Sequence, residues 1–310
     1  MDWNILIAGG GPAGLTAAIY AGRAGWKTSV FDPLGGGGQA SVTDIIHNYP
    51  GFPSGIQGAE LMELMAQQAK AYGVTVDYDQ VIDIQKKGDT FHVTCENSSH
   101  TARAVIYAAG TSPRKLGVPG EEKFIGRGVS FCATCDGALF RDKVVAVVGG
   151  GDSALTEAEF LTRFASEVLL IHRRDEFRAG LATVRRVLDN PKVKRLMSSA
   201  VDEVLGEEQV KSILVRDLGA GKASEIPVDG LFLYVGSDPN SGPIKHLVET
   251  NDNGYVITGE DMSTRTPGLF VAGDVRHKSL RQVATAVGDG ATAAWSAERY
   301  LLESQSEARN

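Results

Sequence analysis

Apolar residues along the chain gather in short runs, and a run is typically followed by glycine and then by a stretch rich in alanine and leucine. Two prominent runs are residues 5–8 (ILIA) and residues 144–148 (VVAVV). A short apolar run that ends in a glycine turn is typical of a buried strand, and the alanine- and leucine-rich stretch after it is typical of a helix. The pattern therefore predicts strand–turn–helix units.

One such unit occurs twice. It spans residues 4–32 and again residues 144–172, so each landmark of the first copy recurs 140 residues later. Each copy ends in a second apolar strand, which makes it a βαβ unit. The first turn, GGGPAG, fits G-x-G-x-x-G, and the second, GGGDSA, fits G-x-G-x-x-A. The residues expected to bind a dinucleotide are Gly9, Gly11, Pro12, Ala13 and Gly14 in the first turn, and Gly149, Gly151, Asp152, Ser153 and Ala154 in the second.

The geometry of the backbone explains why small residues stand at these positions of a dinucleotide-binding turn. The first glycine of the motif permits a tight turn, the second lets the chain approach a pyrophosphate, and the third small residue lets the helix pack close to the strand. The helix N-terminus then offers free N–H groups and the positive end of the helix dipole to the phosphates. A single glycine turn is weak support, because glycine also punctuates ordinary loops. Two turns in the same context at the same spacing predict two dinucleotide sites.

The residue that ends the second strand of each unit distinguishes the two sites. In the first unit it is Asp32, whose carboxylate can accept hydrogen bonds from a free ribose diol. In the second it is His172, followed by Arg173 and Arg174, with Arg178 one turn later. Arginines there can bind a 2′-phosphate bidentately. We expect NADP(H) rather than NAD(H) at the second site; the alternative is that this basic run is only a solvated turn.

A pair of cysteines, Cys132 and Cys135, precedes the second fingerprint and is followed at once by Asp136. Structural zinc normally needs four ligands, and the remaining cysteine, Cys95, is far upstream. Two reduced core thiols are a second alternative. A redox-active dithiol is favoured, because a two-residue spacer lets the sulfurs close a small ring. Asp136 could move the proton that thiol exchange needs, or could simply cap a turn.

Composition narrows the class of protein. A chain of 310 residues suggests about two domains. A net charge of −7 without a basic tract argues against nucleic-acid binding, and no apolar run approaches the roughly 20 residues that span a bilayer. Three cysteines do not make a disulfide scaffold, and the alternation in TFHVTCE predicts that Cys95 is an inward-facing strand residue without chemistry. We expect a cytoplasmic protein without a membrane segment.

Two dinucleotide sites and a dithiol define a path for two electrons. A nicotinamide transfers them as hydride, and a disulfide exchanges them through thiolates. A flavin can accept hydride and pass the pair to a disulfide. The first site is therefore expected to bind FAD and the second NADPH. Electrons would run from NADPH through FAD to the disulfide of Cys132 and Cys135 and on to an external acceptor.

Over nearly its whole length the sequence resembles the low-molecular-weight thioredoxin reductases of the bacterial type. The resemblance rests on GGGPAG, GGGGQA, NYPGFP, CATCDG, GGGDSA, HRRDEFRA, GLFVAGDV and LRQVATAVGDGA, in family order. It implies an enzyme that reduces thioredoxin or a thioredoxin-like protein, and a homodimer. The implied fold is α/β with two doubly wound Rossmann-like domains: a discontinuous FAD domain (residues 1–114 and 243–310) and an inserted NADPH domain carrying the redox pair (residues 115–242).

The resemblance also assigns residues to the flavin. Gln39 and Asn48 would line FAD, and Asp274 would bind its ribityl or phosphate region. Arg281 and Gln282 would lie near the isoalloxazine ring.

In the redox pair, the resemblance makes Cys135 the flavin-side sulfur, Cys132 the sulfur that attacks the protein substrate, and Asp136 the general acid.

Two features depart from the family pattern: His47 stands where a carboxylate is common, and the glycine run at residues 35–38 is longer than usual. The polar tail, residues 303–310, is expected to be frayed.

Two other functions remain open. One is a flavoprotein of the same fold that takes electrons from ferredoxin, or that uses oxygen to oxidise small dithiols; Arg173, Arg174 and Arg178 argue against it. The other is a flavin- or nucleotide-binding regulatory protein whose dithiol is a sensor, which the arginines and Asp136 also disfavour.

Overall fold

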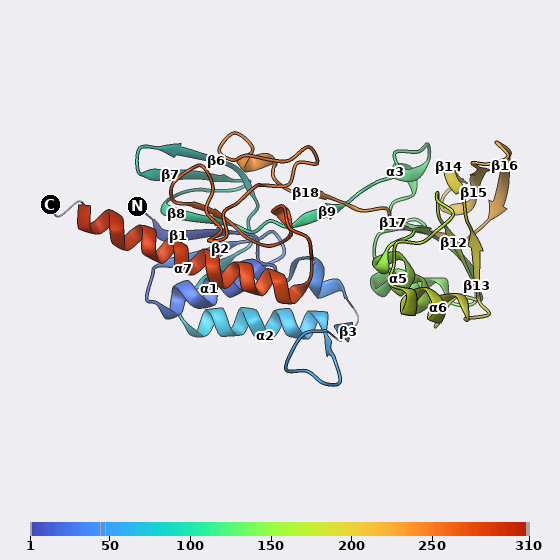
Figure 1. The fold of residues 1–310 in the computed structure, drawn as a ribbon, viewed down its shortest axis with the longest axis horizontal. Helices are drawn as coiled ribbons and strands as arrows, with labels where there is room; N and C mark the ends of the chain where they lie inside the picture. Colours follow the sequence, from blue (N-terminus) through green and yellow to red (C-terminus); the bar gives the residue numbers. More distant parts are fainter. Residues whose placement is uncertain (1, 44, 47, 308–310) are drawn as a thin grey trace. The chain divides into compact units, whose positions relative to one another are not determined.

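The computed structural model describes residues 2–43, 45–46 and 48–307, without the side chains of Cys135, Gln305 and Glu307. The chain divides into two compact units, which Figure 1 shows. Unit 1 consists of residues 1–112 and 238–310, and unit 2 consists of residues 113–237. Unit 2 is thus inserted into the sequence of unit 1.

The units divide slightly earlier than predicted. The predicted boundaries follow residues 114 and 242, whereas the units divide after residues 112 and 237. The chain passes between them in β9 (Thr111–Pro113) and β18 (Ser237–Pro239), which form a two-stranded sheet. The first division falls directly before Pro113, and the second falls within β18, before Pro243.

Unit 1 is built on a sheet that combines parallel strands with an antiparallel meander. Among the described residues it is seven-stranded, in the order β5–β2–β1–β8–β7–β6, with β19 also pairing with β8. Its strands are β1 (Trp3–Ala8), β2 (Thr28–Phe31), β5 (Thr75–Asp77), β6 (Val81–Lys87), β7 (Thr90–Cys95), β8 (Ser99–Tyr107) and β19 (Leu269–Val271). A small hairpin joins β3 (Ile45–Ile46) to β4 (Ile56–Gln57). The helices and 3-10 turns are α1 (Pro12–Arg23), η1 (Gly38–Val42), α2 (Gly58–Ala71), η3 (Gly242–Ile244), η4 (Gly273–Val275) and α7 (Val283–Glu307).

Alternation along β1 explains the two layers on this sheet. Ile5 and Ile7 pack in one core with residues of α1 and α7, while Leu6 and Ala8 pack in another with β6 and β7. Figure 1 shows α1, α2 and α7 together on one side of the sheet. Cys95, at the end of β7, is 3% exposed within the second core, which confirms it as an inward-facing strand residue.

Close approaches position the N-terminus of α1. A Cβ on Gly14 would lie 1.8 Å from the carbonyl oxygen of Gly9, so the third glycine of the fingerprint lets α1 pack against the end of β1. A Cβ on Gly290 in α7 would lie 2.1 Å from the carbonyl oxygen of Ala13. Helix α7 therefore also packs against the first turn of α1.

Unit 2 contains a parallel sheet and a smaller antiparallel one. In the described residues the parallel sheet has five strands, in the order β10–β17–β11–β12–β13, and the antiparallel sheet is β14–β15–β16. The strands are β10 (Val129–Ser130), β11 (Val144–Gly149), β12 (Glu167–Ile171), β13 (Val193–Leu196), β14 (Ser199–Gly206), β15 (Val210–Asp217), β16 (Ala223–Pro227) and β17 (Gly230–Tyr234). The helices are α3 (Glu121–Phe124), α4 (Ala133–Asp136), η2 (Gly137–Phe140), α5 (Asp152–Leu161) and α6 (Leu181–Leu188).

Both predicted βαβ units are present, as β1–α1–β2 and β11–α5–β12. In the second, Val145 and Val147 pack with Ala154 and other residues of α5, while Ala146 and Val148 pack against the antiparallel sheet. The prediction of two doubly wound α/β domains, one of them discontinuous, is confirmed.

Helix α7 continues further than the polar tail suggests, so the prediction of fraying was wrong for residues 303–307. Side chains support this end of the helix: Arg299 pairs with Glu303 at 3.4 Å, and Ser304 Oγ donates to the Tyr300 carbonyl at 2.8 Å. Across the described residues, the helices lack the length and apolar content needed to cross a membrane.

Candidate active site

The first fingerprint lies where β1 ends and α1 begins. Gly9 has a φ of +103°, and a Cβ on it would lie 2.5 Å from the Ala108 carbonyl oxygen, so the turn requires glycine there. Gly11 is the N-cap residue of α1 and Pro12 is its first residue. No described heavy atom lies within 4 Å of a Cβ on Gly11. The turn thus leaves room for a phosphate at the helix N-terminus.

Asp32, predicted to bind a ribose, faces this turn. Its Oδ2 accepts the N–H of Gly10 at 2.7 Å, and its Oδ1 accepts those of Leu34 and Gly36 at 2.9 and 3.1 Å. The residue is 7% exposed. These bonds fix the carboxylate at the turn, and Oδ2 keeps a second lone pair that can accept a ligand hydroxyl.

The predicted flavin residue Asp274 lies in η4, beside the first fingerprint. A Cβ on Gly273 would lie 2.9 Å from the Cβ of Ala13 in α1. Asp274 Oδ1 is buried and accepts no hydrogen bond from a described residue, although Lys278 Nζ lies 3.2 Å away as an ion-pair partner. Lys278 offsets the charge of the carboxylate, and a carboxylate oxygen has a further lone pair, so this position can also accept from a hydroxyl of a ligand.

A buried ion-pair network holds the η4 turn in place. Asp289 of α7 is 8% exposed, and its Oδ1 accepts from Arg276 Nη1 at 3.0 Å. Its Oδ2 accepts both from Lys278 Nζ and from the N–H of Gly273, each at 3.1 Å. Asp289 therefore anchors to α7 the turn that carries Asp274.

Other predicted flavin residues meet from distant parts of the sequence. Asn48 Nδ2 donates to Gln282 Oε1 at 2.9 Å, although 234 residues separate the two. Arg281 Nε donates to the Asp274 carbonyl at 3.4 Å, and its guanidinium carbon lies 4.0 Å from the centre of the Tyr255 ring. Tyr255, which the sequence did not point to, thus helps to hold Arg281.

Gln39 is held separately from that group. Its Nε2 donates to the backbone carbonyl of Thr111 and, at 3.3 Å, to the Thr111 hydroxyl. The preceding glycine run, residues 35–38, has positive φ throughout, which explains why the loop is built of glycine. His47 lies outside the described residues.

The second fingerprint repeats the geometry of the first. A Cβ on Gly149 would lie 2.5 Å from the carbonyl oxygen of Tyr234 at the end of β17. Gly151 is the N-cap residue of α5, and no described heavy atom lies within 4 Å of a Cβ placed on it. Asp152 and Ser153 begin the helix with exposed side chains. This N-terminus also leaves room for a phosphate.

His172 lies beneath the second turn and is 5% exposed. Its ring stacks on Phe177 with 5.6 Å between ring centroids, and a Cβ on Gly150 would fall 2.3 Å from the imidazole. Its Nε2 is buried and makes no hydrogen bond with a described residue. The imidazole therefore supports the turn from below, and its direct role in cofactor binding stays a prediction.

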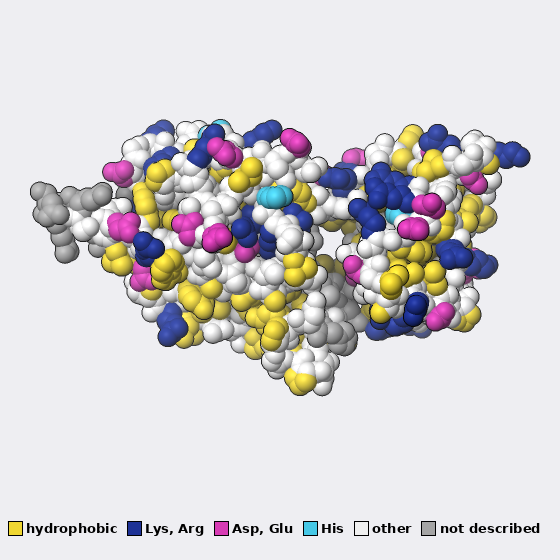
Figure 2. Space-filling model, in the orientation of Figure 1, with side chains coloured by type: hydrophobic (Ala, Val, Ile, Leu, Met, Phe, Trp, Pro, Cys, Tyr) yellow, Lys and Arg dark blue, Asp and Glu magenta, His cyan; other side chains and the backbone are white. Residues whose placement is uncertain are grey.

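The arginines predicted to bind a 2′-phosphate gather around His172. Burial, and then the positive charges of Arg178, Arg174 and Arg173, lower the pKa of His172. All three arginines are exposed. The N–H of Arg178 donates to the Gly150 carbonyl at 2.7 Å, which holds the cluster at the glycine turn. Figure 2 shows Lys and Arg side chains gathered on the visible face of unit 2.

The redox pair lies in and just before α4. Cys132 is disulfide-bonded, and its N–H donates to Ser130 Oγ at 3.0 Å. The side chain of Cys135 lies outside the described part, so its pairing with Cys132 remains a prediction. Cys95 is a free, buried thiol whose pKa is raised to about 11 by burial and by the charge of Asp79. Such a thiol is poorly reactive.

Two side chains lie close to the redox pair. Asp136 makes no side-chain cap to η2 within the described residues, so its carboxylate is not used as a turn cap there. The N–H of Ala133 donates to the hydroxyl of Tyr234 at 2.8 Å. Burial, followed by the charges of Glu157 and Asp136, raises the pKa of Tyr234. The tyrosine hydroxyl therefore remains protonated at neutral pH beside the cysteine helix.

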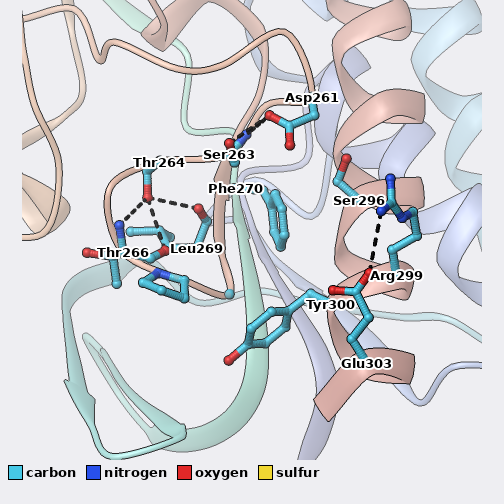
Figure 3. Close-up of a pocket in the computed structure, with 12 residues that line it drawn as sticks. Asp261, Ser263, Thr264, Thr266, Leu269, Phe270, Ser296, Arg299, Tyr300 and Glu303 are labelled. Atoms are coloured by element: carbon cyan, nitrogen blue, oxygen red, sulfur yellow. Dashed lines mark hydrogen bonds and ion pairs between the residues drawn. The ribbon is translucent and has the colours of Figure 1, made fainter. Parts of the chain in front are cut away.

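Figure 3 shows a pocket of about 200 Å³ in unit 1, between α7 and residues 261–270. Ser296, Arg299 and Tyr300 are among its lining residues, and the predicted site residues are not. The predicted sites instead lie at strand ends and helix N-termini, as expected for doubly wound sheets.

The two units suit different dinucleotides. Unit 1 offers the N-terminus of α1, the ribose-type carboxylate of Asp32 and the carboxylate of Asp274, which together fit FAD. Unit 2 offers the N-terminus of α5 and exposed arginines, which fit the extra phosphate of NADPH. The sequence missed Tyr234 and Asp289. A tyrosine at the end of an otherwise apolar strand and an aspartate within an alanine-rich helix were the available signals.

Comparisons with known proteins agree with this geometry. The sequence profile of the pyridine nucleotide-disulphide oxidoreductases matches residues 3–290. The chain is 44% identical to a thioredoxin reductase of Treponema pallidum over 97% of each chain, and 44% identical to one of Bacillus subtilis over 98% of this chain and 96% of that one. The crystal structure of Lactococcus lactis thioredoxin reductase superimposes with a TM-score of 0.93 at 40% identity, covering 97% of this chain and 99% of that one. The chain belongs to the pyridine nucleotide-disulphide oxidoreductase family and, within it, to the low-molecular-weight thioredoxin reductases.

Proposed function

We propose that this protein passes electrons from NADPH through FAD to a disulfide between Cys132 and Cys135, and from there to the disulfide of thioredoxin or a thioredoxin-like protein. The observation that carries the proposal is the disulfide-bonded Cys132 in the same unit as the turn bearing the arginine cluster. FAD and NADPH are the cofactors of this family.

Unit 1 holds FAD in this proposal. The N-terminus of α1 stabilises the pyrophosphate, and Asp32 accepts from a ribose hydroxyl through its spare Oδ2 lone pair. Asp274 Oδ1, whose ion-pair partner is Lys278, also accepts from the ribityl chain. Gln39 and Asn48 line the flavin, and the group formed by Asn48, Gln282 and Arg281 borders its ring. When bound, FAD accepts an electron pair as hydride and yields it to a disulfide.

Unit 2 holds NADPH. The N-terminus of α5 stabilises the pyrophosphate, and Arg173, Arg174 and Arg178 bind the 2′-phosphate. His172 acts as a support for Gly150 rather than as a phosphate ligand, since it is buried and neutral at physiological pH. The exposed arginines disfavour the alternative of a ferredoxin-fed or oxygen-using flavoprotein.

The cysteines carry the final exchange. Two electrons and two protons convert their disulfide to two thiols. The Cys132 thiolate then attacks the disulfide of the partner, forming a mixed disulfide and releasing one partner thiolate. Attack by the Cys135 thiolate on Cys132 restores the enzyme disulfide and releases the second thiolate, and Asp136 acts as the general acid that supplies a proton.

Two further properties belong to the proposal. A homodimer follows from the family resemblance, and exposed apolar side chains on the helices of unit 1, including Tyr20, Leu64 and Trp295, would suit such an association. A cytoplasmic location follows from composition and from a dithiol that must cycle through its reduced form.

A Cys132→Ser variant tests the function. It is expected to lose reduction of a thioredoxin disulfide while NADPH still bleaches its flavin absorbance. Cys95→Ser is the matched control and should keep both activities, because Cys95 is a buried, poorly reactive thiol of unit 1. Persistent disulfide reduction by Cys132→Ser would refute the assignment of the exchange cysteine.

A further inference from the structure

Tyr234 touches both functional motifs of unit 2. Its carbonyl oxygen would lie 2.5 Å from a Cβ on Gly149, so its backbone lies against the first glycine of the dinucleotide turn. Its hydroxyl accepts the N–H of Ala133, the residue that directly follows Cys132, at 2.8 Å. One residue at the end of β17 therefore borders the nucleotide site with its backbone and the redox pair with its side chain.

The hydrogen bond from Ala133 is buried. Ala133 is fully buried, so solvent does not offer an alternative acceptor for its N–H. A buried backbone N–H that loses its acceptor is costly to the state in which the loss occurs. The tyrosine hydroxyl is therefore energetically relevant to whichever redox state contains this bond.

The bond is present when Cys132 is disulfide-bonded. Reduction breaks the S–S bond and frees Cys132. In the proposed pair the disulfide closes a ring around Ala133, and reduction opens that ring, so the geometry that brings the Ala133 N–H to Tyr234 is tied to the oxidised form.

We propose that Tyr234 is a positioning residue that selectively stabilises the oxidised form of the redox pair by accepting the Ala133 N–H. This inference rests on the proposed redox function of Cys132 and Cys135. The carboxylates of Glu157 and Asp136, together with burial, keep the hydroxyl protonated, so its effect is constant through neutral pH.

The test is a glutathione equilibrium on the full FAD-loaded protein without oxygen. Two glutathione thiols reduce the enzyme disulfide to two thiols and become one glutathione disulfide. Acid quenching, alkylation and mass spectrometry then give the fraction of Cys132 present as thiol. Tyr234→Phe, which removes only the hydroxyl, is expected to shift the equilibrium toward the dithiol by roughly fivefold to tenfold, the size of one net hydrogen bond.

Ser212→Ala is the matched control. It removes another buried hydroxyl of unit 2, one that donates to Glu225 at 2.6 Å in the antiparallel sheet. It should lower the unfolding midpoint without changing the glutathione equilibrium. A role that is merely structural would make Tyr234→Phe behave in the same way.

Hydrogen exchange of the wild-type protein gives a second measurement that needs no variant. The Ala133 amide should exchange slowly in the oxidised protein and about tenfold faster after reduction, because opening the ring releases its N–H from Tyr234. An unchanged equilibrium in Tyr234→Phe, or a shift toward the disulfide, would overturn the inference about Tyr234 and leave the proposed function standing. A wild-type disulfide that neither glutathione nor dithiothreitol reduces would overturn the proposed function as well.

Discussion

The backbone N–H of Arg178 donates to the carbonyl oxygen of Gly150 at 2.7 Å, which joins the loop after β12 to the glycine turn after β11. This bond keeps the exposed cations of residues 173–178 beside the N-terminus of α5. A pyrophosphate at the turn and a 2′-phosphate at the arginines can then belong to one ligand. The proposed preference for NADPH over NADH rests on that arrangement.

Replacing both Arg173 and Arg174 with alanine should weaken NADPH binding by about 1–3 kcal/mol for each lost phosphate contact, and should leave NADH binding nearly unchanged. Calorimetric titration with each nucleotide measures the difference. Arg186→Ala serves as the control, because it removes an arginine from α6 of unit 2, where Arg186 pairs with Glu159 at 2.8 Å. Equal losses for the two nucleotides would remove the 2′-phosphate assignment.

The stability of unit 2 should depend on pH through His172. Burial and the neighbouring arginines lower its folded-state pKa, so below the ordinary value of about 6.5 the unfolded chain binds a proton that the folded chain does not. The free energy of unfolding should therefore fall as pH drops below about 6.5 and become level below the folded-state pKa. Urea denaturation between pH 8 and pH 5 measures this fall. His172→Gln should make it shallower, and an identical pH dependence in that variant would contradict the assignment.

The Asp289 network should be the most sensitive electrostatic feature of unit 1. Asp289→Asn should lower the free energy of unfolding by about 3–5 kcal/mol, because Arg276 and Lys278, whose side chains are 15% and 8% exposed, would lose a buried counter-charge. Urea denaturation of the flavin-free protein measures it. Glu303→Gln on the same helix removes only the surface pair with Arg299 and should cost at most about 0.5 kcal/mol. Similar costs in the two variants would contradict this account of the network.

Two glycines of α7 test the close packing that positions α1. Gly290→Ala should destabilise the protein by about 1–3 kcal/mol, because the new Cβ would lie 2.1 Å from the Ala13 carbonyl oxygen. Gly288→Ala should instead stabilise it by about 0.5–1 kcal/mol, since no described heavy atom lies within 4 Å of that Cβ and alanine favours the helix. Thermal unfolding of both variants provides the comparison. Shifts of the same sign would show that helix packing is not set at residue 290.

Local patterns explain why so much of the fold could be predicted. The strands β1 and β11 are short apolar runs that end in glycine turns, and the turns need glycine because backbone atoms such as the Ala108 carbonyl approach them closely. These constraints act between neighbours in sequence or recur at a fixed spacing. They therefore appear directly in the residue pattern.

The rest of the site depends on packing between distant segments. In the sequence, Asp289 is one polar residue of a helix. Its role as an anchor of the η4 turn becomes visible only in the structure, where α7 packs against that turn. In the sequence, Tyr234 is the last residue of a strand. The structure shows that its hydroxyl accepts the N–H of Ala133. His172 looked like part of the basic cluster, yet the fold buries its ring beneath Gly150. Periodicity carries no information about these contacts.

An anaerobic titration with NADPH, followed by flavin absorbance and with NADH added to a parallel sample, measures whether unit 2 delivers electrons to the flavin. Efficient bleaching by NADPH is expected, with more than one equivalent consumed per flavin, because the flavin and the Cys132 disulfide each take an electron pair. Much weaker bleaching is expected with NADH at equal concentration. Flavin that neither nucleotide bleaches would contradict the claim that the arginine-bordered site of unit 2 supplies electrons to the flavin.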